Sequence, residues 1–210
     1  MRYFSYNDYM DCTKNGEIEE IKKVEEETAK YEVISGEEQS YSTKNKIIQM
    51  LKDKTNFKMF IQDFLNLSEM LETEKIIYCK ELETRTNNII YKIEQKEIYI
   101  LIKVIDKIDN NITYKIFEDS LNTMKKTNEE QMKNKRHPII IPIVIYVGKE
   151  KWNIDSYNIS NEVNYTEFEK NRINFSYNFI NIHSLEISKL LKMNSNITKE
   201  FINAKINIYK

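Results

Sequence analysis

The chain has 210 residues and a formal net charge of −1 at pH 7, with 31% charged and 40% hydrophobic residues. This composition is typical of a globular protein with one substantial core, and it excludes disorder of the whole chain. A pI near 6.2 excludes a general electrostatic attraction to nucleic acid, so any contact with DNA must be local.

Cysteine usage and hydropathy bear on where the protein resides. Cys12 and Cys79 have neither the spacing of a metal site nor the density of a secreted disulfide scaffold, so we expect a cytoplasmic protein. The most apolar run, residues 139–147, is too short for a helix that crosses a bilayer. We therefore expect no membrane role.

Helical patterns come first in the chain. Residues 17–31 carry apolar side chains at steps of three and four and have an acidic outer face, which predicts an amphipathic helix. Two further helical stripes follow in residues 44–51 and 57–65, with Thr55 as a candidate N-cap between them. We expect these two helices to cover one face of a sheet.

Strand patterns follow. Residues 75–82 are rich in β-formers and predict a first strand, and residues 88–93 and 98–105 are close enough to form a hairpin. Because side chains alternate along a strand, Asn88 lies on one side of the first hairpin strand, and Lys103 shares a side with Tyr99 on its partner.

The sequence also predicts a crossover helix and a further strand after the hairpin. Residues 111–127 have helical spacing, and residues 139–146 form a nearly continuous apolar run that is typical of a strand buried on both faces. Pro138 and Pro142 instead favour an edge or a bulge, because proline cannot donate to a ladder.

The remainder of the chain predicts loops and two short helices, residues 184–193 and 198–208. We divide the chain into an N-terminal helical extension, a central core, and a C-terminal segment of helices and loops that packs on the core. Their ranges are 1–40, 41–155 and 156–210.

Three motifs carry a resemblance to a known family. They are Arg85-Thr-Asn-Asn-Ile-Ile-Tyr-Lys92, Leu101-Ile-Lys-Val-Ile105 and Pro138-Ile-Ile-Ile-Pro-Ile-Val-Ile-Tyr-Val-Gly-Lys-Glu-Lys-Trp152. Their order resembles the Rpn family of recombination-promoting nucleases, also labelled PD-(D/E)XK family transposases. The resemblance implies an α/β, restriction-endonuclease-like fold, in which helices flank a mixed sheet.

The functional positions of that family are altered here. Where the family has Asp in the first motif and Glu-x-Gln in the second, this chain has Asn88, Lys103 and Ile105. Asn45 stands where the family has the Asp of an upstream His-Asp-Lys. The resemblance implies that these four positions are vestigial, so we expect no catalytic residue and no metal ligand among them.

The chemistry explains why the changes matter. In the family, the Asp and the Glu hold Mg²⁺, which stabilises charge on the scissile phosphate and generates the nucleophile. A lysine about 4 Å from a divalent ion would cost roughly 8 kcal/mol at an effective dielectric constant of 20. We therefore expect no cofactor, with Mg²⁺ required only if other acids replace the missing pair.

Nearby acids leave an alternative open. Glu94, Asp106 and Asp109 flank the second strand of the hairpin, and carboxylates displaced in this way would make the protein an active Mg²⁺-dependent DNA endonuclease. The competing interpretation is that Glu94 lies at a solvated hairpin tip and Asp109 at a helix entry.

A basic segment is the candidate for nucleic-acid binding. Lys133, Lys135 and Arg136 lie close together and could contact a phosphate backbone, although a solvated loop has the same composition. We expect Trp152 to be a packing anchor and His183 to be a surface or hydrogen-bonded histidine.

The first hypothesis for function is a catalytically degenerate nuclease-like protein that acts as a DNA- or protein-binding regulatory module. Candidate partners are DNA, an intact nuclease paralogue or a second copy of this chain. The second hypothesis is the active endonuclease, and the third is a remnant of a mobile element.

Overall fold

The computed structural model describes five stretches of the chain, residues 42–65, 75–83, 88–131, 138–153 and 175–209. The predicted N-terminal extension 1–40, with its helix 17–31, lies outside them.

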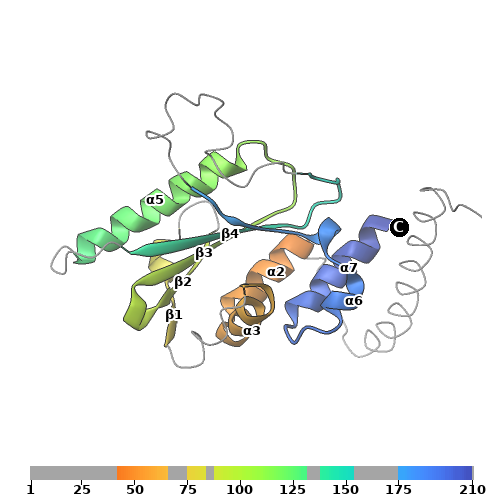
Figure 1. Ribbon diagram of the computed structural model, residues 1–210, viewed down its shortest axis with the longest axis horizontal. Helices are drawn as coiled ribbons and strands as arrows, with labels where there is room; N and C mark the ends of the chain where they lie inside the picture. Colours follow the sequence, from red (N-terminus) through yellow and green to blue (C-terminus); the bar gives the residue numbers. More distant parts are fainter. Residues whose placement is uncertain (1–41, 66–74, 84–87, 132–137, 154–174, 210) are drawn as a thin grey trace, which may run out of the picture.

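A five-stranded mixed sheet forms the centre of the described structure (Figure 1). The strands lie in sequence order; β1, β2 and β3 are antiparallel to one another, and β3, β4 and β5 are parallel. The bounds are Ile76–Tyr78 for β1, Ile89–Ile93 for β2, Ile98–Ile105 for β3, Ile139–Tyr146 for β4 and Asn178–Asn181 for β5.

Helices cover both faces of this sheet (Figure 1). Helix α5 (Ile112–Gln131) connects β3 to β4 across one face. The other face carries α2 (Thr43–Lys52), α3 (Lys54–Leu65), α6 (Ile187–Leu190) and α7 (Ile197–Tyr209). Short 3-10 turns occur at η2 (Lys80–Leu82), η3 (Glu94–Lys96) and η6 (Ile182–Ser184). The arrangement confirms the predicted α/β fold class.

The alternation of β3 builds a core on each face of the sheet. Ile100, Ile102 and Val104 lie in the larger cluster with side chains of α2, α3 and α7. Tyr99 and Leu101 lie in the smaller cluster with side chains of α5. Because both faces are buried, a slip of one residue would move every side chain to the wrong cluster, so the register is strongly fixed.

The predicted hairpin is confirmed. Ile89 pairs with Ile102 and Ile93 pairs with Ile98, and η3 closes the turn. Glu97 adopts the left-handed conformation at φ 51°, which returns the chain into β3. The strand predicted for residues 75–82 is shorter than expected. It ends at Tyr78, and the predicted range continues as the 3-10 turn η2.

β4 is an interior strand, although Pro142 favours an edge. Ile139 and Val147 donate their backbone N–H groups to the carbonyls of Glu97 and Ile105, at 3.0 and 2.9 Å, so the odd-numbered positions bond toward β3 and the even-numbered residues of β4 face β5. β5 begins at Asn178, which pairs with Ile143. Pro142 faces the β5 side, but it lies before the first residue that pairs with β5. Its lack of an N–H therefore removes no hydrogen bond between β4 and β5.

The connection between α2 and α3 corrects a predicted cap. The Oδ1 of Asp53 accepts the backbone N–H of Asn56 at 2.9 Å, and its carbonyl accepts the N–H of Phe57 at 2.9 Å. Asp53 is thus the N-cap residue of α3, and the predicted Thr55 lies inside the first turn.

The C-terminal part of the chain contributes more than predicted. The sequence predicts a loop where the structure has β5, Asn178–Asn181. The helix predicted for residues 184–193 is confined to Ile187–Leu190. The helix predicted for residues 198–208 is confirmed as α7. Phe201 of α7 is fully buried in the larger cluster, so this segment shares the core of α2 and β3.

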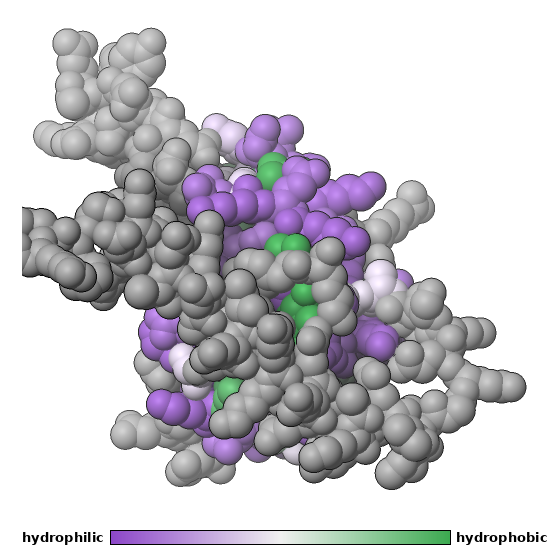
Figure 2. All heavy atoms as spheres, turned by 90° about the vertical axis from the view of Figure 1, so that its right-hand side faces the viewer, coloured by the Kyte–Doolittle hydropathy of each residue, from purple (hydrophilic) through white to green (hydrophobic). Residues whose placement is uncertain are grey.

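Across the described stretches, none of the helices combines the length and the apolarity that a membrane span requires. Figure 2 shows the side of the molecule that carries α6 and α7; its coloured atoms are mainly hydrophilic, and the hydrophobic ones form small separate spots.

Candidate functional site: a buried lysine in the hairpin

The hairpin brings the two altered family positions together. Ile89 pairs with Ile102, so the next position of the same antiparallel register places Asn88 opposite Lys103. Both side chains are on the α5 side of the sheet, and both are buried, with 1% of Asn88 and 8% of Lys103 exposed. Side-chain alternation, combined with this register, accounts for the shared location.

The ammonium group of Lys103 has two side-chain partners. Its Nζ donates to the Oδ1 of Asn88 at 3.3 Å and to the Oδ2 of Asp119 at 2.6 Å. Asp119 comes from α5 and is 6% exposed, so the ion pair is almost completely removed from water. Asn88, Lys103 and Asp119 are called the Lys103 cluster below.

The sequence of α5 explains why an acid reaches the sheet. Asp119 follows Ile112 by seven residues and precedes Thr123 by four, so all three lie on the buried face of the helix. The hydroxyls of Ser120, Thr123 and Thr127 donate to backbone carbonyls four residues earlier, at 2.7, 2.9 and 3.0 Å. The hydroxyl groups of these residues thus have hydrogen-bond acceptors within the helix itself, whereas the carboxylate of Asp119 accepts a hydrogen bond from Lys103 of the sheet.

Sequence reasoning missed Asp119. The available signal was an acid on the apolar stripe of a predicted helix, since carboxylates are seldom fully buried unless they are paired. Identifying its partner required the tertiary structure, because Asp119 is 16 residues from Lys103 in the chain and on another element.

The Lys103 cluster does not fit Mg²⁺, the ion that the family resemblance implies. A divalent ion needs several anionic oxygens, whereas the cluster offers one carboxylate, one neutral amide oxygen and a positive charge between them. The described residues also contain no group of three or more His, Cys, Asp or Glu side chains placed to hold a metal.

The other two vestigial positions lie apart from the cluster. Ile105 is half-buried and packs against the smaller apolar cluster at the end of β3. Asn45 is exposed in the first turn of α2, which packs on the opposite face of the sheet. The hairpin thus assembles only Asn88 and Lys103 of the four predicted positions.

The displaced carboxylates are engaged elsewhere. Glu94 pairs with Lys75 at 3.1 Å beside the hairpin tip. Asp106 pairs with Lys44 of α2 at 3.4 Å. Asp106 lies in the bend after β3, and its partner Lys44 belongs to α2, which covers the sheet face opposite the Lys103 cluster.

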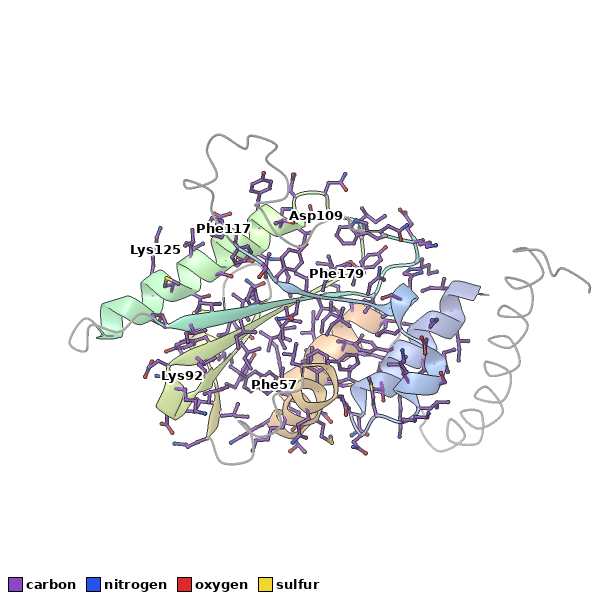
Figure 3. The ribbon with its side chains drawn as sticks, in the orientation of Figure 1. Phe57, Lys92, Asp109, Phe117, Lys125 and Phe179 are labelled. Atoms are coloured by element: carbon purple, nitrogen blue, oxygen red, sulfur yellow. The ribbon has the colours of Figure 1, made fainter. Side chains whose placement is uncertain are left out.

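Asp109 has the role of a helix entry. It lies just before α5 (Figure 3). Its Oδ1 accepts the backbone N–H of Asn111 at 3.1 Å, and its Oδ2 binds Lys115 at 2.7 Å. These contacts are the ones that the competing interpretation, a helix entry, predicts for Asp109.

The third motif of the resemblance builds a packed turn after β4. The hydroxyl of Tyr146 donates to the carbonyl of Glu150 at 2.7 Å, and a Cβ on Gly148 would lie 2.4 Å from that hydroxyl oxygen. Trp152 is 7% exposed and packs edge-on against Tyr146, which confirms its prediction as a packing anchor. His183 contacts the carbonyl of Gly148 at 3.0 Å, as expected for a hydrogen-bonded histidine.

A cavity of about 350 Å³ lies near the end of β4, between the start of α2 and the end of α7. Its lining includes Val147 and Ala204, which belong to the larger apolar cluster. It therefore lies on the sheet face opposite α5 and gives no access to the Lys103 cluster.

The predicted DNA-binding residues Lys133, Lys135 and Arg136 lie outside the described residues. Within them, Lys125 and Lys126 are exposed near the end of α5, and Lys125 points away from the sheet (Figure 3).

The mixed sheet with helices on both faces and the central hairpin define a restriction-endonuclease-like α/β protein. Residues 42–207 match the sequence model of the family described as "Putative transposase, YhgA-like", and the chain belongs to that family. The match includes every described strand and confirms the resemblance to PD-(D/E)XK family transposases. No curated protein and no solved structure matches the chain.

Proposed function

We propose that this chain is a catalytically degenerate member of its family, a pseudonuclease that acts as a DNA- or protein-binding regulatory module. The observation that carries the proposal is the Lys103 cluster. There the ammonium group of Lys103, on the second strand of the hairpin, lies 2.6 Å from the carboxylate of Asp119.

Electrostatics support the loss of hydrolysis. Metal-assisted cleavage of a phosphodiester needs a divalent ion between anionic ligands, next to the phosphate. Lys103 supplies a positive charge at the family's Glu position, and Asn88 supplies no charge at its Asp position. The cluster is also buried, so a phosphate group could not contact it without a change in the packing around it.

The test is a plasmid-cleavage assay. The purified chain is incubated with supercoiled plasmid in Mg²⁺ or Mn²⁺, beside a variant that carries Asn88→Asp, Lys103→Glu and Ile105→Gln. We expect no nicking by the wild-type chain. Nicking that disappears in Asp106→Asn or Glu94→Gln would overturn the proposal and establish the displaced-carboxylate endonuclease.

Binding to DNA is tested separately by gel shift. Because Lys133, Lys135 and Arg136 would supply three phosphate contacts, we expect the affinity to fall roughly 40-fold between about 50 and 200 mM salt. Replacing these three residues with Gln should abolish the shift. The matched control replaces the exposed lysines Lys189, Lys192 and Lys199 with Gln and should bind like wild type.

The protein-binding form of the proposal predicts a different result. The chain would then give no salt-dependent shift, and it would co-elute with an intact family member or with a second copy of itself in size-exclusion chromatography. Absence of both kinds of binding would contradict the proposal and leave the mobile-element remnant.

A further inference from the structure

The cavity beside the carboxyl end of β4 has no part in the proposed function. Its volume of about 350 Å³ lies at the lower end of the roughly 300–1,000 Å³ typical of small-molecule sites. The register aligns Ile105 of β3 with Tyr146 of β4, and Tyr146 with Asn181 of β5, so these parallel strands end at one edge of the sheet. Val147 follows β4 directly and lines the cavity. Ligands of open α/β sheets commonly bind at this place, outside the carboxyl ends of the strands.

One part of the cavity lining is apolar. Val147 and Ala204 are buried members of the larger apolar cluster, and Ile208 is half-buried and packs against that cluster. The last two residues belong to α7, which is a neighbour of α2 on this face of the sheet (Figure 1). The cavity therefore offers an apolar surface that is continuous with the core, on which a short hydrocarbon chain can be removed from water.

The other part of the lining consists of hydrogen-bond donors. Thr43 of α2 is half-buried, and Lys149 and Asn207 are exposed. Among the residues that the structure describes, none of these three side chains has a hydrogen-bond or ion-pair partner, and the described lining contains no acid. A hydroxyl, an ammonium and an amide group can all donate to oxygen atoms, so this part of the lining favours an anionic group with several acceptors.

We propose that the cavity binds a small organic anion, a carboxylate or phosphate group on a short apolar chain. Thr43, Lys149 and Asn207 contact the anionic group, and the chain packs on the apolar part of the lining. The inference goes beyond the proposed function and does not rest on it, because it uses neither the Lys103 cluster nor the basic segment. It gives the protein a small-molecule ligand in addition to a macromolecular partner.

The first experiment titrates the isotope-labelled full chain with four compounds and follows the backbone amide signals by NMR. Hexanoate and hexyl phosphate are the anions, and butanoate and hexylammonium are the controls. We expect hexanoate to bind roughly tenfold more tightly than butanoate, because it buries two more methylene groups. It should bind at least about fivefold more tightly than hexylammonium, whose charge is repelled by Lys149.

The signals that shift must include those of Thr43, Val147 and Ala204, which come from three elements around the cavity. The tighter of the two anions identifies the preferred head group. Binding of butanoate or hexylammonium as tight as that of hexanoate, shifts confined to other parts of the chain, or no binding of either anion would overturn the inference.

The second experiment changes the lining. Lys149→Gln should weaken hexanoate binding about fivefold, and Ala204→Leu, which fills part of the cavity, by at least about tenfold. The matched control is Lys199→Gln, an exposed lysine at the start of α7 that lies about 12 Å along the helix from Asn207 and should bind like wild type. Equal affinities of the Lys149→Gln and Lys199→Gln variants would contradict the inference, also where Ala204→Leu does not fold.

The two proposals fail in distinguishable ways. Plasmid cleavage by the wild-type chain would sink the pseudonuclease proposal, whatever the titrations show. A cavity that takes no organic anion would sink the second proposal, whatever the cleavage assay shows.

Discussion

At the residue scale, Tyr91 shows how a side chain of the nuclease-like motif supports the fold. It is fully buried, its ring stacks on Phe57 at 3.7 Å between centroids, and its hydroxyl lies 2.9 and 2.8 Å from the carbonyls of Leu51 and Lys52. These carbonyls end α2, where helical partners are missing. Tyr91 therefore fastens the end of α2 to the sheet.

The same environment controls the ionisation of Tyr91. Burial, followed by the negative charges of Asp53 and Glu83, raises its pKa above the ordinary value of 10.0. Its contribution to stability is therefore complete below pH 10 and is lost at higher pH, because the unfolded chain ionises first.

Replacing Tyr91 with Phe tests this linkage. We expect Tyr91→Phe to lower the free energy of unfolding by about 1 kcal/mol at pH 7, and the difference from wild type to narrow at about pH 11. Urea midpoints at the two pH values measure it. Because the charge of Tyr91 raises the pKa of Tyr78, both proteins carry Tyr78→Phe, and the remaining tyrosines are common to both. A difference that stays constant or widens would contradict the assignment.

At the element scale, a local cap sets where a helix begins, whereas a buried contact links two elements. Asp53 decides where α3 begins, through hydrogen bonds to its own first turn. Lys103 and Asp119 link α5 to the sheet, through an ion pair between two elements. The cap joins residues that are close in the sequence, and the ion pair joins residues that are farther apart.

The cap gives a direct prediction. Asp53→Ala removes the acceptor of the Asn56 N–H, so we expect a loss of about 1 kcal/mol in the free energy of unfolding. Thr55→Ala is the matched control, because Thr55 is also exposed and lies inside the helix, and it should change stability by less than about 0.5 kcal/mol. Denaturant unfolding of both variants decides which residue is the cap.

At the scale of the whole molecule, the C-terminal segment is part of the nuclease-like core. β5 pairs with β4, and Ile182, Ile197 and Phe201 are fully buried in the same cluster as α2 and β3. Loss of this segment would expose the apolar side of β4 and the inner faces of α2 and α3 to water.

Truncation tests that dependence. We expect a fragment of residues 42–155 to lack a cooperative thermal transition, because burial of each large apolar side chain stabilises by about 1.5–3 kcal/mol and several would be lost together. The matched fragment 42–210 should retain a transition. Cooperative melting of the shorter fragment would instead establish residues 41–155 as an independent domain.

The sequence alone determined the hairpin, the crossover helix, the family, and the loss of negative charge at positions 88 and 103, where Asn88 is neutral and Lys103 is positive. These features follow from side-chain alternation, helical spacing and residue identity, which are local properties of the chain. Only the tertiary structure decided that Asp119 neutralises Lys103, that β5 completes the sheet, and that Pro142 loses no ladder bond. Each of these depends on which segments meet in space, and no local pattern encodes that meeting.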